Sequence, residues 1–201
     1  MKILNPKVQD DLTAGRAIRL NLGVGSRPRA GYYGLDWIEM PGVDVVADLN
    51  QPLVGLPDNS VEAIYTHHTF EHVVNFLPLL KEIHRVMIPN GQIEVVVPHF
   101  SNPYGYSDPT HVRFFGLYSF FYFSDEIDQP KRKVPAFYIP ERFAIDAIKI
   151  TMMPTLIMFK PIRRLTTKIV NSSISMLDWY ERSWCRHFPA DSIKYSLRVK
   201  K

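Results

Sequence analysis

The chain of 201 residues has one cysteine, no long apolar run and little excess charge, and each shortage excludes a class of protein. Its single Cys185 excludes an internal disulfide framework and a cysteine-rich metal site. No run of about 18 apolar residues occurs, so we expect no membrane-spanning helix, and MKILNPKVQDDL at the start lacks the apolar core of a signal peptide. A net charge of only +4, without an RNA- or DNA-binding signature, argues against a nucleic-acid partner. We therefore expect a cytoplasmic enzyme or binding domain.

Short apolar segments alternate with turn signals between residues 18 and 100. Several segments are near-continuous runs of Val, Ile and Leu, which is typical of parallel strands buried on both faces. Between the last two of them, residues 72–87 place apolar side chains at three- and four-residue spacing, which predicts a helix. A strand, a helix and a strand form a right-handed crossover, so the predicted class is α/β. The predicted strands are 17–22, 32–37, 43–49, 63–68 and 92–100.

The second half of the chain has a different character. Residues 101–140 are rich in aromatics and prolines, which predicts a folded cover segment. Beyond it we expect a strand at 142–152, a helix at 166–188 and a last strand at 191–201. One domain over 1–201 is the simplest partition, with 18–100 as the cofactor-binding core, 101–140 as the cover and 141–201 as the C-terminal part.

The first predicted strand leads into LNLGVGSR at residues 20–27, where two glycines stand one residue apart. Glycine lets the backbone approach a ligand closely, so this turn suits a nucleotide-like cofactor, although it also suits a plain tight corner. A dinucleotide-binding fingerprint, G-x-G-x-x-G, needs a third glycine and opens a helix. Pro28 stands at that third position, and the following SRPRAGYYG is too short for a full helix. A pyrophosphate site is therefore disfavoured.

Polar residues stand near the ends of three consecutive predicted strands. Asn21 lies at the mouth of the first, Asp36 ends the second and Asp48 ends the third. Open α/β sheets bind ligands outside the carboxyl ends of their strands, where a carboxylate can accept both hydroxyls of a ribose. Asp36 suits that role, and Asp48 could meet an adenine amino group. The alternative is that both aspartates only cap turns or helices.

These motifs together resemble the class I S-adenosylmethionine-dependent methyltransferases, in particular the methyltransferase type 11 group. The resemblance covers about residues 18–123 and rests on LNLGVGS, GLDW, VDVVADLNQPLVGLPDNSVEAIYTHHTFEHV and LLKEIHRVMIPNGQIEVVVPHF. It implies a Rossmann-like fold: a mostly parallel sheet with a C-terminal antiparallel strand and helices on both faces. It also implies S-adenosylmethionine as cofactor.

The resemblance further implies where the cofactor lies. Residues 21–25 would surround its methionine part, Asp36 would bind the ribose, and Asp48 with Leu49 would flank the adenine. Two positions depart from the usual pattern: Asn21 replaces an acid, and Arg27 replaces the third glycine. Asn21 can still accept a hydrogen bond from an amino group, but it supplies no charge. The implied cofactor-binding residues are Asn21, Leu22, Gly23, Gly25, Asp36, Trp37, Asp48, Leu49 and His67.

Histidines supply the candidates for catalysis. His68 and His72 follow the fourth predicted strand, and His111 lies in the cover segment. A histidine is the natural general base near neutral pH. The alternative is structural: the histidines make hydrogen bonds, and Glu71 caps the following helix. We expect no metal site, because the HHxxEH spacing differs from the helical H-E-x-x-H pattern and no cysteine assists.

Residues 148–168 join a Met-rich apolar run to a basic cluster. Three interpretations remain open: packing on the core, a lid or homodimer contact, and a peripheral membrane surface.

The sequence thus predicts a methyltransferase that acts on a small-molecule or glycan or lipid-linked acceptor, on oxygen in preference to carbon. Two rivals stay open, a non-catalytic protein of the same fold that binds a partner and a nicotinamide-dependent oxidoreductase. The predicted location is cytoplasmic, with the membrane periphery as an option.

Overall fold

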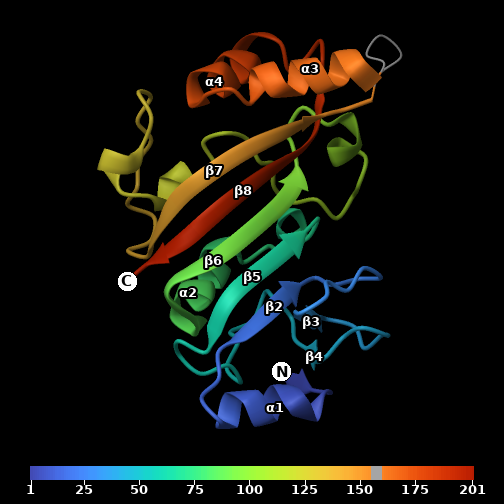
Figure 1. The fold of residues 1–201 in the computed structure, drawn as a ribbon, viewed down its shortest axis with the longest axis vertical. Helices are drawn as coiled ribbons and strands as arrows, with labels where there is room; N and C mark the ends of the chain where they lie inside the picture. The colour runs from blue at the N-terminus through green and yellow to red at the C-terminus, as the bar shows by residue number, and fades with distance from the viewer. Residues whose placement is uncertain (155–159) are drawn as a thin grey trace.

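The computed structural model describes residues 1–154 and 160–201, and a single eight-stranded sheet runs through it (Figure 1). The strand order is β1-β4-β3-β2-β5-β6-β8-β7. Neighbours from β4 to β6 are parallel, whereas β8 lies antiparallel between β6 and β7, and β1 lies antiparallel to β4. The expected mostly parallel sheet with a C-terminal antiparallel strand is therefore confirmed. The strands are β1 (Lys2–Ile3), β2 (Ile18–Leu22), β3 (Tyr33–Asp36), β4 (Val45–Val46), β5 (Val61–His67), β6 (Met87–Pro98), β7 (Arg142–Met152) and β8 (Ala190–Lys200).

The burial of each strand's side chains depends on the strand's place in the sheet. In β2 at the centre of the sheet, four of the five residues are buried, as expected where both faces are covered. In β8 buried and partly exposed residues alternate, with Ile193, Tyr195, Leu197 and Val199 on the core face. The strand predicted at 43–49 shrinks to Val45–Val46, because the residues after it turn around Asp48.

Four α-helices accompany the sheet in the described part of the chain: α1 (Pro6–Thr13), α2 (Phe76–Val86), α3 (Lys160–Val170) and α4 (Ile174–Ser183). Helix α2 is amphipathic, as its spacing predicted, and buries Phe76, Leu79, Leu80, Ile83 and Val86. It begins later than predicted, because a short 3-10 turn, Phe70–His72, precedes it. No element was expected where α1 lies.

The single helix predicted at 166–188 is wrong, since the chain forms α3 and α4 with a break between them. The side chain of Asn171 leaves the helix to bond the backbone of Ile150 in β7, accepting from its N–H at 2.7 Å and donating to its carbonyl at 2.8 Å. Ser173 then caps α4 by accepting from the N–H of Met176. Both helices lie at the end of β7 (Figure 1).

Residues 101–140 fold into turns and short 3-10 segments that bury a cluster of aromatic rings. Phe120 stands 4.6 Å from Tyr195 of β8 and 6.2 Å from Phe76 of α2, measured between ring centroids. The predicted cover segment is thus folded, and part of it belongs to the core. The first third of the cover segment lies near the end of β5. Its Arg113 donates to the carbonyl of Val73 at 2.8 Å.

The segment 148–168 is only partly described, because residues 155–159 lie outside the described residues. Its first part continues β7 and its last part belongs to α3. Among the described residues, no helix combines the length and the apolar character that crossing a membrane requires.

Candidate functional site

The glycine turn follows β2 directly and packs against the segment after β5. Gly23 and Gly25 have φ angles of 65° and 50°, in the left-handed region that favours glycine. A Cβ on Gly23 would lie 2.8 Å from Cβ of Thr69 and closer still to the rest of that side chain. Thr69 in turn donates its hydroxyl to the carbonyl of Leu22 at 3.2 Å. Gly23 is therefore required both by backbone conformation and by space.

Asp36, the last residue of β3, holds the glycine turn in place. Its carboxylate accepts from the N–H of Gly25 at 2.9 Å and from the N–H of Trp37 at 2.8 Å. The side chain is nearly buried. Each carboxylate oxygen keeps further lone-pair capacity, because an ionised carboxylate offers about four acceptor sites. Asp36 can thus fix the turn and accept from a ligand at the same time.

Two adjoining cavities open on either side of this turn and share Gly23, Gly25 and His68. The larger has a volume of about 580 Å³ and contains the predicted ribose and adenine residues. The smaller, of about 460 Å³, contains Asn21 and His67. Leu22 alone among the predicted cofactor residues lines neither, because its side chain is buried in the core. The larger cavity is lined by Asp36, Trp37, Ala47, Asp48, Leu49, Asn50, Thr69, His72, Val73 and Thr110 besides the shared residues.

The wall of the larger cavity carries the exposed ring of Trp37 and, besides Asp36, a second carboxylate, Asp48. Trp37 lines the cavity and is 73% exposed, so its indole ring is accessible to a ligand there. Asp48 accepts from the N–H of Asn50 at 2.8 Å, so it also caps a turn, as the structural alternative expected. Asn50 itself was missed by the sequence reasoning. Its side-chain oxygen accepts from the N–H groups of Val74 and Asn75 and ties this wall to the start of α2.

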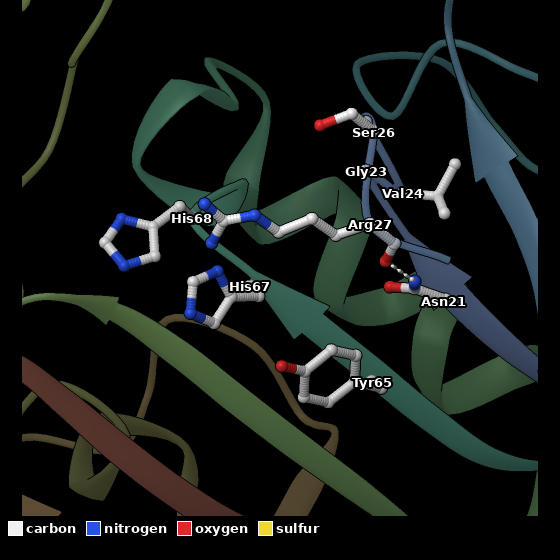
Figure 2. Close-up of a pocket in the computed structure, with 9 residues that line it drawn as sticks. Asn21, Gly23, Val24, Ser26, Arg27, Tyr65, His67 and His68 are labelled. Carbon is white, nitrogen blue, oxygen red and sulfur yellow. Dashed lines mark hydrogen bonds between the residues drawn. The ribbon is translucent and has the colours of Figure 1, made fainter. Parts of the chain in front are cut away.

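Arg27 extends across the smaller cavity toward His67 and His68 (Figure 2). The amide of Asn21 donates to the carbonyl of Arg27 at 3.4 Å, so the two residues that depart from the family pattern contact each other. No acid in the described part of the chain forms an ion pair with Arg27. Burial lowers the pKa of His67, and the charges of His68 and Arg27 lower it further. Arg27 therefore places a positive charge in the smaller cavity, and His67 contributes a neutral imidazole to its wall.

Arg29 is a second residue near the site that no sequence motif indicates. Its guanidinium lies 4.0 Å from the ring centroid of Tyr65 and donates to Glu94 at 3.1 Å. These contacts fasten the loop between β2 and β3 to the neighbouring strands β5 and β6.

The three predicted catalytic histidines gather at the same end of the sheet. His68 borders both cavities and has a φ of 54°, a strained conformation for a residue other than glycine. His72 lines the larger cavity, and the ring of His111 lies 4.7 Å from it although the two residues are far apart in the chain. The structural alternative, in which Glu71 caps the following helix, is wrong. Glu71 is 1% exposed and lies in the 3-10 turn before the helix.

Comparison with known proteins adds a partial domain match and a fold. Residues 29–95 match the model of the methyltransferase domain family. No curated protein matches the chain.

Solved structures with a similar fold include three that align over most of both chains. A proposed methyltransferase of Bacillus halodurans is 12% identical with a TM-score of 0.55 and covers 98% of this chain and 100% of its own. The YcgJ protein of Bacillus subtilis is 14% identical with a TM-score of 0.51 and covers 98% of each chain. A proposed sarcosine dimethylglycine methyltransferase of Galdieria sulphuraria is 12% identical with a TM-score of 0.53 and covers 97% and 84%. At these identities the likeness concerns the fold. Residues 29–95 therefore resemble the methyltransferase domain family, and the chain as a whole shares the fold of these structures.

Proposed function

We propose that this protein transfers the methyl group of S-adenosylmethionine to a hydroxyl oxygen of a small-molecule or glycan acceptor, including one linked to lipid. The observation that carries the proposal is the Asp36 carboxylate, which holds the glycine turn between two cavities at the carboxyl ends of β2 and β3.

The residues present fit the cofactor. At Gly25 the glycine turn offers open backbone, because a Cβ there would meet nothing within 4 Å, and the two cavities fall within the usual 300–1,000 Å³ range of small-molecule sites. Asp36 would accept from the ribose hydroxyls, and Trp37 would cover the adenine. Arg27 and Asn21 would face the carboxylate and the amino group at the methionine end. The bound cofactor supplies an electrophilic methyl on a positively charged sulfur.

His68 is the residue we assign as general base. It stands where the two cavities meet, and its Nδ1 lies 3.5 Å from a carboxylate oxygen of Glu71, which places a carboxyl group beside the ring. Nε2 of His68 would take the proton of the acceptor hydroxyl, while the bound cofactor would supply the methyl group and its sulfur would keep the electron pair of the broken C–S bond. A neutral imidazole is needed for this step.

The connection between β2 and β3 argues against a nicotinamide cofactor. Residues 23–32 contain no helix, so the helix N-terminus that would receive a pyrophosphate is missing from this part of the described chain.

Helix α3 supports a location at the membrane periphery, which is one of the three roles expected for residues 148–168. Ile162, Leu165 and Ile169 share one face of α3 and are 42%, 60% and 49% exposed. Basic residues Arg164 and Lys168 are also exposed on this helix. An apolar stripe beside basic side chains suits a surface of anionic lipid, where a lipid-linked acceptor would reside. Phosphatidylglycerol vesicles should sediment the protein and Leu165→Glu should abolish this, whereas a dimer in solution without lipid binding would favour the homodimer contact.

The first experiment is a calorimetric titration with S-adenosylmethionine, S-adenosylhomocysteine and NAD in parallel. We expect micromolar binding of the first two, about −8 kcal/mol, and none of NAD. Asp36→Ala should abolish the binding while circular dichroism shows an intact fold. Absence of binding by all three compounds would overturn the proposal in favour of a partner-binding protein of the same fold.

The second experiment tests transfer. Tritiated methyl from S-adenosylmethionine should appear in hydroxylated sugars or glycolipids drawn from an acceptor panel, as a base-stable ether. His68→Ala should lower kcat by about 10²-fold or more without changing cofactor affinity. The exposed His187→Ala serves as the matched control. Normal turnover of His68→Ala would remove that residue from catalysis.

A further inference from the structure

We propose that Glu71, His72 and His111 bind a divalent transition-metal cation at the edge of the larger cavity. Each of the three offers one ligand atom, and these atoms all lie within 4.8 Å of one another. The sequence predicts no metal site because the HHxxEH spacing differs from the H-E-x-x-H pattern and no cysteine assists. The fold supplies the missing ligand from a distant segment, the turn that carries His111. We call these residues the Glu71 cluster.

The carboxylate of Glu71 is the strongest reason for a cation here. The residue is 1% exposed, and neither of its oxygens has a hydrogen-bond partner in the described structure. Burying an ionised carboxylate without a partner is very costly, so such groups are normally paired, protonated or bound to metal. The ion-pair partner of Glu71 is Nδ1 of His68. It lies 3.5 Å from Oε1 of Glu71, which is beyond hydrogen-bond distance. A cation between Glu71 and the two histidines would supply the missing charge.

The hydrogen bonds of the two histidines leave the same ring nitrogen, Nε2, without a hydrogen-bond partner on both, and on His111 this atom lies 3.6 Å from a carboxylate oxygen of Asp108. His111 donates from Nδ1 to the carbonyl of Gly105 at 2.9 Å, because a carbonyl can only accept. Thr110 gives its hydroxyl hydrogen to Asp108 at 2.6 Å, so its oxygen accepts from Nδ1 of His72 at 2.8 Å. Because Nδ1 carries the hydrogen in both rings, Nε2 of each neutral ring keeps a lone pair that can bind a metal. Histidine ligands in metal sites are oriented in this way, through a hydrogen bond from the other ring nitrogen.

Backbone contacts hold the two halves of the cluster together. The N–H of Val112 donates to the carbonyl of Glu71 at 2.9 Å, which joins the residue after His111 to one of the other ligands. The guanidinium of Arg113 donates to the carbonyls of Val73 and Val74. The cluster is thus fixed by bonds that do not involve its ligand atoms, as a built site requires.

The donor set indicates which cations fit. Two imidazole nitrogens and one carboxylate oxygen suit Zn²⁺, Co²⁺ or Fe²⁺, whereas Mg²⁺ and Ca²⁺ prefer oxygen ligands. Ligands about 2.1 Å from a tetrahedral Zn²⁺ are roughly 3.4 Å apart, so the side chains would close inward by about 1.4 Å at most. The fourth position would be open to water.

A role in methyl transfer rests on the proposed function. His72 and Thr110 line the larger cavity, so a cation here would lie next to the cofactor. An acceptor hydroxyl that displaced the water would have its pKa lowered by the cation, which makes its oxygen easier to deprotonate. The proton would still pass to His68, since Glu71 can use one oxygen for the cation and turn the other toward that ring.

The test is metal binding by the full chain after removal of metals with a chelator. Zn²⁺ should bind with one-to-one stoichiometry in calorimetry, Co²⁺ should give a visible absorption band, and Mg²⁺ should compete with neither. Glu71→Gln and His111→Ala should each weaken Zn²⁺ binding by about 100-fold or more. His187→Ala, an exposed histidine outside the cluster, should bind as the native chain does.

Thermal unfolding provides a second readout that does not depend on activity. Zn²⁺ should raise the Tm of the native chain but not that of Glu71→Gln, and without metal this variant should be at least as stable as the native chain, because the buried charge is gone. Absence of stoichiometric Zn²⁺ binding, or binding that Glu71→Gln and His111→Ala leave unchanged, would overturn the proposal. Titration of the same metal-free samples with S-adenosylmethionine reports separately on the cofactor site.

Discussion

Three glycines with positive φ allow the steric argument at the glycine turn to be tested by comparison. Gly15, Gly23 and Gly25 have φ angles of 68°, 65° and 50°. A Cβ would meet nothing within 4 Å at Gly15 or Gly25, but at Gly23 it would overlap Thr69. Alanine in the left-handed region costs about 1–2 kcal/mol at any of the three positions. At Gly23 the overlap adds about 1–3 kcal/mol, because Thr69 and the turn must move apart.

The expected loss of unfolding free energy is thus about 1–2 kcal/mol for Gly15→Ala and Gly25→Ala and about 2–5 kcal/mol for Gly23→Ala. Urea unfolding at a common m value measures all three. Gly25→Ala should also lose cofactor affinity, because Gly25 borders both cavities, whereas Gly15→Ala should keep it. The reasoning is refuted if Gly23→Ala is no more destabilising than Gly15→Ala.

Two further variants test other contacts. Glu82→Gln should cost about 1–2 kcal/mol near pH 7, because Glu82 accepts from Arg85 and from the N–H of Leu53. The Arg85 hydrogen bond lowers the pKa of Glu82 in the folded chain, so its stabilisation is present above the ordinary 4.5 and disappears as pH falls through the lower folded value. Urea unfolding should show the difference between native chain and variant closing on acidification below pH 4.5, and a constant difference would contradict this. Arg27→Ala should weaken the binding of S-adenosylmethionine and S-adenosylhomocysteine by about tenfold, because both carry the carboxylate that the guanidinium would face. The binding of adenosine, measured by the same calorimetry, should not change. An equal loss for adenosine would place Arg27 away from the carboxylate.

Much of the sheet could be predicted because its signals are local. The strand predicted at 142–152 is the observed β7, and those at 17–22 and 191–201 lie within one residue of β2 and β8. Apolar runs and alternation are properties of neighbouring residues, so they survive in the sequence alone. The helix at 166–188 failed because the break depends on a hydrogen bond from Asn171 to a strand far away in sequence.

In the candidate site, too, the positions that depend on strand ends could be predicted from the sequence, and those on irregular segments could not. Asp36 and the glycine turn stand at strand ends, where topology alone brings them together. The proximity of His111 to Glu71 depends on the path of an irregular segment, for which no periodic signal exists. The direction of the Arg27 side chain is likewise decided by rotamers and neighbours rather than by spacing.

The insertion of β8 between β6 and β7 has a consequence for folding order. β7 pairs only with β8 within the described sheet, so residues 142–152 have no partner strand until residues 190–200 are available. During synthesis, the segment from β2 to β6 can form its parallel sheet first, while β7 waits as an unpaired apolar strand. Such a strand is open to pairing with another chain. The expected vulnerable species is therefore a nascent or truncated chain that contains β7 but lacks β8, and its aggregation would be relieved by supplying the β8 sequence as a separate peptide.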